Sequence, residues 1–283
     1  MIQLGGHPCG EGAPLVVIAG PDVIESEEHL LRHARLLKAI ADRLGVPFIL
    51  KCSYDKANRT SGKSFRGPGL LEGLKILQRV KREVGVPVLT DVHEISHVAA
   101  AAEVVDVLQV PAFLCRQTDL VEAVARTGRG VNLKKGQFVA PHNMVEAAKK
   151  ALEAGNPNVL VTERGACFGY NNLVVDMRGL AVMRAAGMAV CFDGTHSVQL
   201  PSSGGTQTLG ERAMVSVLAR AAAAAGIDAL FTEVHEDPDH APCDGPSSLT
   251  PALFESVLRD VLAIRRALGQ AAPPASPLPR ATS

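Results

Sequence analysis

Residues Glu27–Leu44, EEHLLRHARLLKAIADRL, are followed by Gly45-Val-Pro-Phe-Ile-Leu-Lys-Cys-Ser-Tyr54, and this succession of patterns decides the fold. In the first part, apolar residues such as Leu30 and Leu37 recur at helical spacing. Gly45 then suits the left-handed conformation that ends many helices. The short apolar run Phe48–Tyr54 has the length of a buried strand. The stretch therefore predicts a helix, a cap and a strand.

The same alternation continues along the chain. The eight predicted strands are Leu15–Gly20, Phe48–Tyr54, Pro87–Val92, Val107–Ala112, Gly130–Gly136, Asn158–Gly165, Met188–Thr195 and Ala229–His235. The eight predicted helices are Glu27–Leu44, Leu70–Val84, Ile95–Val104, Asp119–Arg126, Met144–Ala154, Met177–Ala186, Leu209–Ala225 and Pro251–Leu268. This series predicts an α/β protein with a single (β/α)8 TIM barrel, which typically takes about 250 residues. An open doubly wound sheet is the alternative, but strict alternation favours closure.

The domain boundaries follow from the same series. Residues 14–269 are predicted to form the barrel, and residues 1–13 precede it as an amino-terminal segment. Residues 270–283 are rich in proline and small side chains, which predicts a disordered tail.

Composition argues against several classes of protein. Of 283 residues, 47% are hydrophobic, and 29 Lys and Arg residues balance 29 Asp and Glu residues. The sequence therefore does not predict a basic surface for binding nucleic acid.

Neither a signal peptide nor a membrane span is evident, so we expect a soluble, cytoplasmic protein without a membrane partner. The six cysteines lack a Cys-x-x-Cys pair and are expected to be reduced and mostly structural and buried.

Chemically capable side chains gather at the carboxyl ends of the predicted strands, where barrel enzymes build their sites. A cationic set suits a small phosphorylated substrate, and consists of Lys51, Lys56, Arg59, Lys134 and Arg164. A second set has the ligand types of a metal site, and consists of Asp22, His196, Glu233 and Asp244. Each residue alone is more typical of a solvated or hydrogen-bonded strand end. Five cations from three strands and their loops are hard to explain in that way.

A collinear series of motifs extends over roughly residues 14 to 268. It comprises Ile18–Ser26, Lys56–Ser61 (KANRTS), Leu89–His93, Gln109–Asp119, Asn132–Gln137, Thr162–Gly165, Phe168–Leu173, Phe192–Gln199 and Cys243–Pro246. In this order the motifs resemble the 3-deoxy-D-manno-octulosonate 8-phosphate synthase family, whose members condense phosphoenolpyruvate with D-arabinose 5-phosphate. The resemblance implies a homotetramer, a role in lipopolysaccharide biosynthesis and no organic cofactor.

The resemblance also implies roles for individual residues. Phosphoenolpyruvate would be bound by Lys51, Lys56, Gln109, Lys134 and Arg164. Arabinose 5-phosphate would be bound by Asn58, Arg59, Ser61, Asp91, Arg116 and Ser197, with some contacts coming from a neighbouring subunit. The catalytic residues would be Lys56, Asn58, His196 and Asp244.

Position 22 departs from the family pattern. Metal-dependent members have Cys at the position that matches Asp22, and metal-independent members have Asn. The flanking Ile18-Ala-Gly-Pro resembles the metal-dependent type and Cys243-Asp-Gly-Pro resembles the metal-independent type, so the resemblance alone does not decide between them. Carboxylates crowded around His196 must take up a proton or be neutralised by a cation, which favours a divalent metal on Asp22, His196, Glu233 and Asp244. Such an oxygen-rich site prefers Mn, Fe or Mg over Zn. The alternative is that Asp22, protonated or hydrogen-bonded, substitutes for Asn without a metal.

Three other functions compete with the synthase. The first is the related 3-deoxy-7-phosphoheptulonate synthase, which acts on erythrose 4-phosphate. The second is a Schiff-base aldolase that uses Lys51 or Lys134. The third is a barrel that binds anions without catalysis.

Overall fold

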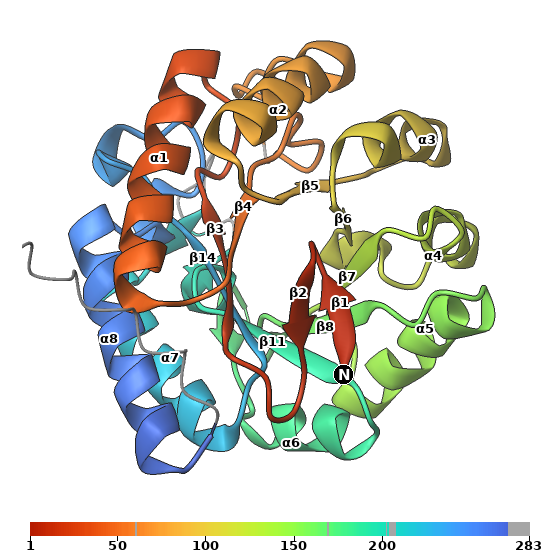
Figure 1. Ribbon diagram of the computed structural model, residues 1–283, viewed down its shortest axis with the longest axis vertical. Coiled ribbons are helices and arrows are strands. Elements are labelled where there is room, and N and C mark those ends of the chain that lie inside the picture. Colours follow the sequence, from red (N-terminus) through yellow and green to blue (C-terminus); the bar gives the residue numbers. More distant parts are fainter. Residues whose placement is uncertain (60, 169, 202, 204–207, 271–283) are drawn as a thin grey trace, which may run out of the picture.

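The computed structural model describes residues 1–59, 61–168, 170–201, 203 and 208–270. Within these residues, eight parallel strands close into a barrel in the order β11-β14-β3-β4-β5-β6-β7-β8 (Figure 1). The strands are β3 Val16–Gly20, β4 Phe48–Lys51, β5 Val88–Asp91, β6 Val107–Val110, β7 Gly130–Lys134, β8 Val159–Glu163, β11 Ala189–Asp193 and β14 Ala229–Glu233. The predicted single (β/α)8 barrel is confirmed.

Helices surround the barrel and cover the outward side chains of its strands (Figure 1). They are α1 Glu27–Leu44, α2 Leu70–Val84, α3 Ile95–Val104, α4 Thr118–Ala125, α5 Pro141–Glu153, α6 Arg178–Ala185, α7 Arg212–Ala225 and α8 Pro251–Ala267. The observed helices differ from the predicted ones mainly in the first residues of α5 and α7. Helix α5 begins earlier, at Pro141, because proline suits the first helical position. Helix α7 begins later because Leu209–Gly210 forms a strand, β13, instead.

The stretch around α1 shows how the chain makes each turn. The Ser26 side chain accepts a hydrogen bond from the backbone N–H of His29 at 3.1 Å, which caps the start of α1. Gly45 ends the helix with φ 66°, a left-handed conformation that glycine adopts without steric cost. The predicted helix and cap are confirmed here, and the strand begins at Phe48 as predicted but ends at Lys51 rather than at Tyr54.

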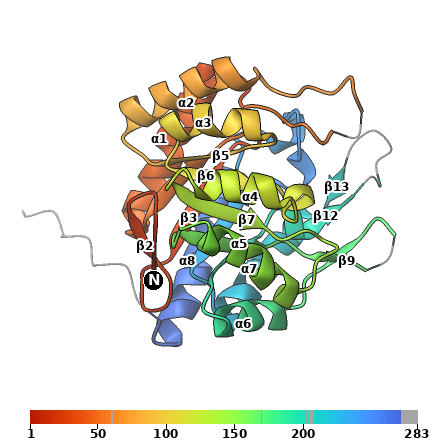
Figure 2. The ribbon, with the colours of Figure 1, turned by 90° about the vertical axis from the view of Figure 1, so that its right-hand side faces the viewer.

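The amino-terminal segment is a hairpin rather than a plain lead-in. Strands β1 Ile2–Leu4 and β2 His7–Cys9 pair antiparallel, and Leu4 and Cys9 pack among the apolar side chains inside the barrel. The hairpin covers the amino-terminal end of the barrel (Figures 1 and 2). The polar loops that could form a site therefore lie at the opposite, carboxyl end of the barrel.

Two short antiparallel pairs extend the loops at the carboxyl end (Figure 2). One joins β9 Ala166–Cys167 to β10 Leu173–Val174, and the other joins β12 Gln199–Leu200 to β13. Among the cysteines, Cys167 is exposed, which corrects the expectation of burial, because it lies on this extension. The other five are buried. The predicted tail, apart from residue 270, lies outside the described residues.

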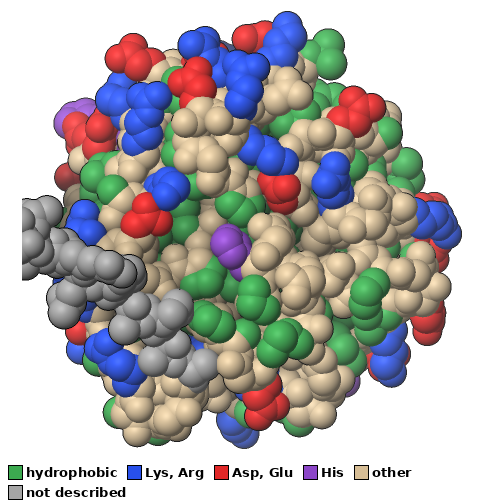
Figure 3. Space-filling model, viewed as in Figure 1, with side chains coloured by type: hydrophobic (Ala, Val, Ile, Leu, Met, Phe, Trp, Pro, Cys, Tyr) green, Lys and Arg blue, Asp and Glu red, His purple; other side chains and the backbone are tan. Residues whose placement is uncertain are grey.

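The face seen in Figure 3 is the hairpin end of the barrel. Its rim mixes acidic and basic side chains, and its centre is mainly hydrophobic with a histidine among the hydrophobic side chains. In the part of the chain that the structure describes, no helix is long and apolar enough to cross a membrane.

Candidate active site at the carboxyl end of the barrel

A cavity of about 670 Å³ opens at the carboxyl ends of the strands. It brings together ten of the residues predicted from the sequence. These are Lys51, Lys56, Asn58, Arg59, Asp91, Gln109, Lys134, Arg164, His196 and Asp244. The size fits small-molecule substrates, whose sites usually measure about 300–1,000 Å³.

Five other predicted residues do not line this cavity. Asp22 and Glu233 are buried, and both lie against Lys51 at its floor. Ser197 is also buried, and its hydroxyl donates to the backbone oxygen of Asp193 at 2.6 Å. Ser61 and Arg116 lie on loops outside the cavity lining of the single chain.

The polar residues of the inner wall form one hydrogen-bonded layer across five strands and their ends. Ser53 and Gln109 both donate to the Asp91 carboxylate. Asn132 donates to Gln109 Oε1 at 2.8 Å, and Thr162 donates to Asn132 Oδ1 at 2.6 Å. Burial disfavours the ionised form of Asp91, but nearby lysines outweigh burial and lower its pKa to about 2. The layer therefore holds a fixed negative charge beneath the cationic cavity wall.

Asp22 connects two of the predicted lysines. Lys51 Nζ lies 3.4 Å from Asp22 Oδ1 and donates to the Asp22 backbone oxygen at 3.0 Å, and Lys56 Nζ contacts the same carboxylate. A side chain at Gly20 would place its Cβ 2.0 Å from the Lys51 backbone oxygen. Glycine at the end of β3 therefore permits the close approach that puts Asp22 beside β4.

The pKa values of the neighbouring carboxyl groups of Asp22 and Glu233 are shifted in opposite directions. Burial disfavours the carboxylate of Asp22, but Lys56 and Lys51 outweigh burial and lower its pKa. Burial and the charge of Asp22 together raise the pKa of Glu233 well above its ordinary range. The crowding predicted for these carboxylates is confirmed.

Lys134 sits between a carboxylate and an aromatic ring. Its Nζ contacts Asp193 and lies 3.5 Å from the centre of the Phe231 ring, a cation–π geometry. Asp193 also lies 2.8 Å from His196 Nδ1. Burial lowers the pKa of Lys134, although Asp193 opposes this shift. One carboxylate thus orients both the predicted substrate-binding lysine and the predicted catalytic histidine.

Arg164 has an unused donor at the cavity. Its Nη2 donates to Gln199 Oε1 at 2.9 Å, and Gln199 Nε2 in turn donates to Asp244 Oδ2 at 2.8 Å. Arg164 Nη1 is buried and has no hydrogen-bond partner. A buried donor without a partner is costly unless a ligand satisfies it. Gln199 was not among the predicted site residues, although it ends the motif that begins at Phe192.

The predicted metal ligands converge in two overlapping groups. Potential ligand atoms of His196, Glu233 and Asp244 lie within 4.8 Å of one another, as do those of Asp22, Cys243 and Asp244. Asp244 belongs to both groups and adopts a left-handed conformation, φ 49°, which Asp tolerates better than most residues. The sequence prediction missed Cys243, and its position directly before Asp244 was the available signal.

A (β/α)8 barrel with a cationic cavity at its carboxyl end defines an enzyme architecture for small anionic substrates. The model of the DAHP synthetase I family matches residues 3–265, and the chain belongs to this family.

Curated relatives narrow this class. The chain is 57% identical to a 2-dehydro-3-deoxyphosphooctonate aldolase of Trichlorobacter lovleyi, over 93% of this chain and 97% of the relative. It is 56% identical to the protein of that name from Synechococcus, over 92% of both chains. For the Acidithiobacillus ferrooxidans protein the identity is 58%, over 91% of this chain and 92% of the relative. The name denotes the enzyme family that the motifs resemble, so the resemblance is confirmed.

Proposed function

We propose that the protein condenses phosphoenolpyruvate with D-arabinose 5-phosphate and water, giving 3-deoxy-D-manno-octulosonate 8-phosphate and phosphate. The names of the relatives support this reaction over condensation with erythrose 4-phosphate. The observation that carries the proposal is the unpartnered Nη1 of Arg164 in a cavity that Lys51, Lys56 and Lys134 also line. The product leads to lipopolysaccharide.

The phosphoenolpyruvate site lies on the floor and one wall of the cavity. Arg164 presents a free donor, and Lys134 approaches from the neighbouring strand β7. Lys51 and Lys56 add two further ammonium groups around Asp22. Gln109 completes this set by holding the polar layer in place. Two anionic groups on one substrate, a phosphate and a carboxylate, match this density of cations.

The arabinose 5-phosphate site lies toward the mouth of the cavity. Asn58 and Arg59 line the cavity from the loop after β4, and Arg59 Nη2 donates to the Pro242 backbone oxygen at 3.0 Å. The assignments of Ser61, Arg116 and Ser197 remain part of this proposal. Asp91, fixed at the end of β5, faces the same space. The homotetramer and the cytoplasmic location also remain predictions.

The residues act mainly by position and charge. The enol carbon 3 of phosphoenolpyruvate attacks the sugar aldehyde, water adds at carbon 2, and phosphate leaves with cleavage of its carbon–oxygen bond. Holding both substrates in reacting geometry lowers the barrier by several kcal/mol. In this proposal Lys56, together with Asn58, stabilises the developing negative charge and moves a proton, and His196 and Asp244 assist the addition of water; all four residues line the cavity.

A divalent cation fits the residues at the floor of the cavity. Asp22 Oδ2 and Glu233 Oε2 are buried and lack hydrogen-bond partners. His196 and Asp244 add ligand atoms of the right kinds. For these four residues we infer Mn, Fe or Mg rather than Zn. When bound, the cation would polarise oxygen atoms of the substrates as a Lewis acid.

The first experiment measures phosphate release from phosphoenolpyruvate with arabinose 5-phosphate, using chelator-stripped protein with and without added manganese. Activity in either condition supports the synthase, and activity only with manganese supports the metal. Release only when erythrose 4-phosphate replaces arabinose 5-phosphate would transfer the proposal to the heptulosonate reaction. No release with either sugar contradicts both.

A further inference from the structure

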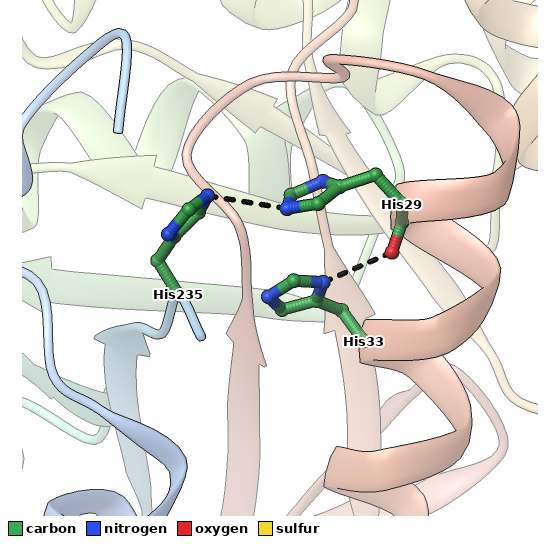
Figure 4. Close-up of side chains that lie close together, drawn as sticks. All are labelled: His29, His33 and His235. Carbon is green, nitrogen blue, oxygen red and sulfur yellow. Dashed lines mark hydrogen bonds between the residues drawn. The ribbon is translucent and has the colours of Figure 1, made fainter. Parts of the chain in front are cut away.

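Among the residues that the structure describes, three groups of side chains lie close enough to hold a metal, and two of these groups share Asp244. The free lone pairs of their ligand atoms decide which groups can bind one. The first consists of His29, His33 and His235, at the junction of α1 with the loop after β14 (Figure 4). His33 Nδ1 lies 2.9 Å from the His29 backbone oxygen and donates to it, and the Glu236 N–H donates to His33 Nε2 at 3.0 Å. Both ring nitrogens of His33 are therefore already used.

His235 is used in the same way. The backbone N–H of Asp237 donates to His235 Nδ1 at 3.0 Å. The ring proton therefore resides on Nε2, which donates to Glu25 Oε1 at 2.8 Å and lies 3.1 Å from His29 Nε2. A metal needs a free lone pair on each ligand nitrogen, and two of the three histidines have none to offer. This cluster joins α1 to the β14 loop without a metal.

His196 has the opposite arrangement. Its Nδ1 lies 2.8 Å from Asp193 Oδ2 without the angles of a hydrogen bond, and the proximity of this carboxylate favours the proton on that nitrogen. The lone pair of Nε2 then faces Glu233 Oε1 at 3.7 Å and Asp244 Oδ2 at 3.6 Å. A carboxylate behind the ring and acidic oxygens in front of it are typical of a metal-binding histidine.

Cys243 belongs to the same centre. Its side chain is buried, and its sulfur lies within 4.8 Å of ligand atoms of Asp22 and Asp244. Two ligands on opposite sides of one ion, at metal–sulfur and metal–oxygen bond lengths near 2.3 and 2.1 Å, lie about 4.4 Å apart. The limit of 4.8 Å is close to this value, so the Cys243 sulfur can share one ion with Asp22 and Asp244, and Asp244 links it to His196 and Glu233.

The centre also has oxygen atoms that lack partners. Asp22 is 5% exposed and Glu233 is 0% exposed, and one carboxylate oxygen of each has no hydrogen-bond partner. Two such buried oxygens beside a histidine lone pair are suited to bind a cation in addition to the ammonium groups of Lys51 and Lys56.

We propose that Cys243 binds a divalent cation through its sulfur, together with His196, Glu233, Asp244 and Asp22. This inference rests on the metal site of the proposed function and extends it. The thiol proton passes to solvent when the sulfur–metal bond forms, and no electrons are transferred. In this arrangement the sulfur ligand comes from Cys243 in the loop after β14, and Asp22 provides an oxygen ligand.

The sulfur changes which cation the site prefers. With oxygen and imidazole alone, magnesium and manganese are suitable, but a thiolate favours softer ions such as iron, cobalt or zinc. The preference expected from the four predicted ligands is thereby shifted away from magnesium.

The test uses cobalt, because Co²⁺ bound to a thiolate absorbs strongly in the near ultraviolet. Chelator-stripped full-length protein is loaded with one equivalent of Co²⁺, and its spectrum is compared with those of Cys243→Ser and Cys115→Ser. Cys115 is also buried, with 0% of its surface exposed against 7% for Cys243, and lies outside the cavity lining. We expect the sulfur band in the wild type and in Cys115→Ser, and its loss in Cys243→Ser while cobalt, measured by elemental analysis, is still bound. An unchanged band in Cys243→Ser overturns the proposal.

A second measurement avoids dependence on a variant that fails to fold. X-ray absorption at the cobalt edge of the loaded wild type should show one sulfur neighbour at about 2.3 Å. A shell of nitrogen and oxygen only, or failure of the wild type to bind cobalt, overturns the proposal. The phosphate-release assay separates this outcome from that of the proposed function. Sulfur-bound cobalt without phosphate release refutes the synthase alone, and release from protein free of any cation together with a sulfur-free shell refutes Cys243 alone.

Discussion

The ammonium group of Lys56 contacts the carboxylate of Asp22. The contact joins the loop after β4 to the end of β3 and directs Lys56 into the cavity that Arg164 also lines. Asp22 thus forms ion pairs with Lys51 and Lys56 on one side and lies beside the carboxyl group of Glu233 on the other. The cationic set and the metal set, which the sequence separated, meet at this residue.

Lys56→Ala should lower kcat for phosphate release by at least about 100-fold, because it removes a cation aimed at developing negative charge. Initial rates at saturating substrates measure this loss. Lys63→Ala, which changes an exposed lysine of the same loop, is the matched control and should retain wild-type rates. Equal rates in both variants would remove Lys56 from the mechanism.

Borohydride added during turnover should trap no covalent adduct. The proposed reaction uses no Schiff base, and burial of Lys51, although it disfavours the ammonium form, is outweighed by surrounding carboxylates that raise its pKa. Intact-protein mass spectrometry checks this result. A mass increase equal to the reduced imine of arabinose 5-phosphate or of the 2-keto product, mapped to Lys51 or Lys134, would support the Schiff-base alternative instead.

Arg164→Lys should raise the KM for phosphoenolpyruvate by about 10-fold or more and leave the KM for arabinose 5-phosphate nearly unchanged. Lysine cannot donate to Gln199 and to a substrate oxygen through one planar group. Steady-state kinetics with each substrate varied in turn tests this, with the exposed Arg126→Lys as control. An equal rise in both KM values contradicts the assignment.

Asn132→Leu should destabilise the fold by roughly 1–3 kcal/mol for each buried group that it leaves without a partner. Gln109 and Thr162 both hydrogen-bond to the Asn132 side chain. Urea unfolding followed by circular dichroism gives the change in free energy. Gln78→Leu, on the exposed side of α2, should change stability little. A neutral Asn132→Leu would mean that the layer tolerates an apolar residue.

The histidine cluster of Figure 4 should make stability depend on pH. Burial and the neighbouring histidines lower the pKa of His29 to about 4, and burial lowers the pKa of His33. Because both values lie below the ordinary 6.5, the unfolded chain takes up protons first. Stability is therefore complete above pH 6.5 and falls between pH 6.5 and about 4.

Unfolding free energies at pH 7.5 and pH 5.5 test this dependence. For each histidine that must stay neutral, the slope approaches about 1.4 kcal/mol per pH unit. His29→Gln should lose part of the slope, whereas His142→Gln, an exposed control, should keep it. A slope that is identical in all three proteins would show that the cluster does not couple to folding.

The fold was largely predictable because periodicity is local. Each helix and each barrel strand corresponds to a run of residues whose apolar spacing can be read without its neighbours, and helices α1, α2 and α3 begin and end at the predicted residues. The hairpin β1–β2 was missed because each strand is only three residues long. Runs of that length carry no clear period, and only packing inside the barrel shows their role.

The sequence by itself determined the alternation of strands and helices, the carboxyl-end position of the site and its surplus of cations. Only the tertiary structure decided which side chains meet. Lys134 and Lys135 are adjacent, yet Lys134 lines the cavity and Lys135 Nζ donates to backbone oxygens such as that of Gly165. Cys243 reaches Asp22 only because the barrel closes through β14 and β3. Local patterns depend on neighbouring residues, whereas a site depends on contacts between distant ones.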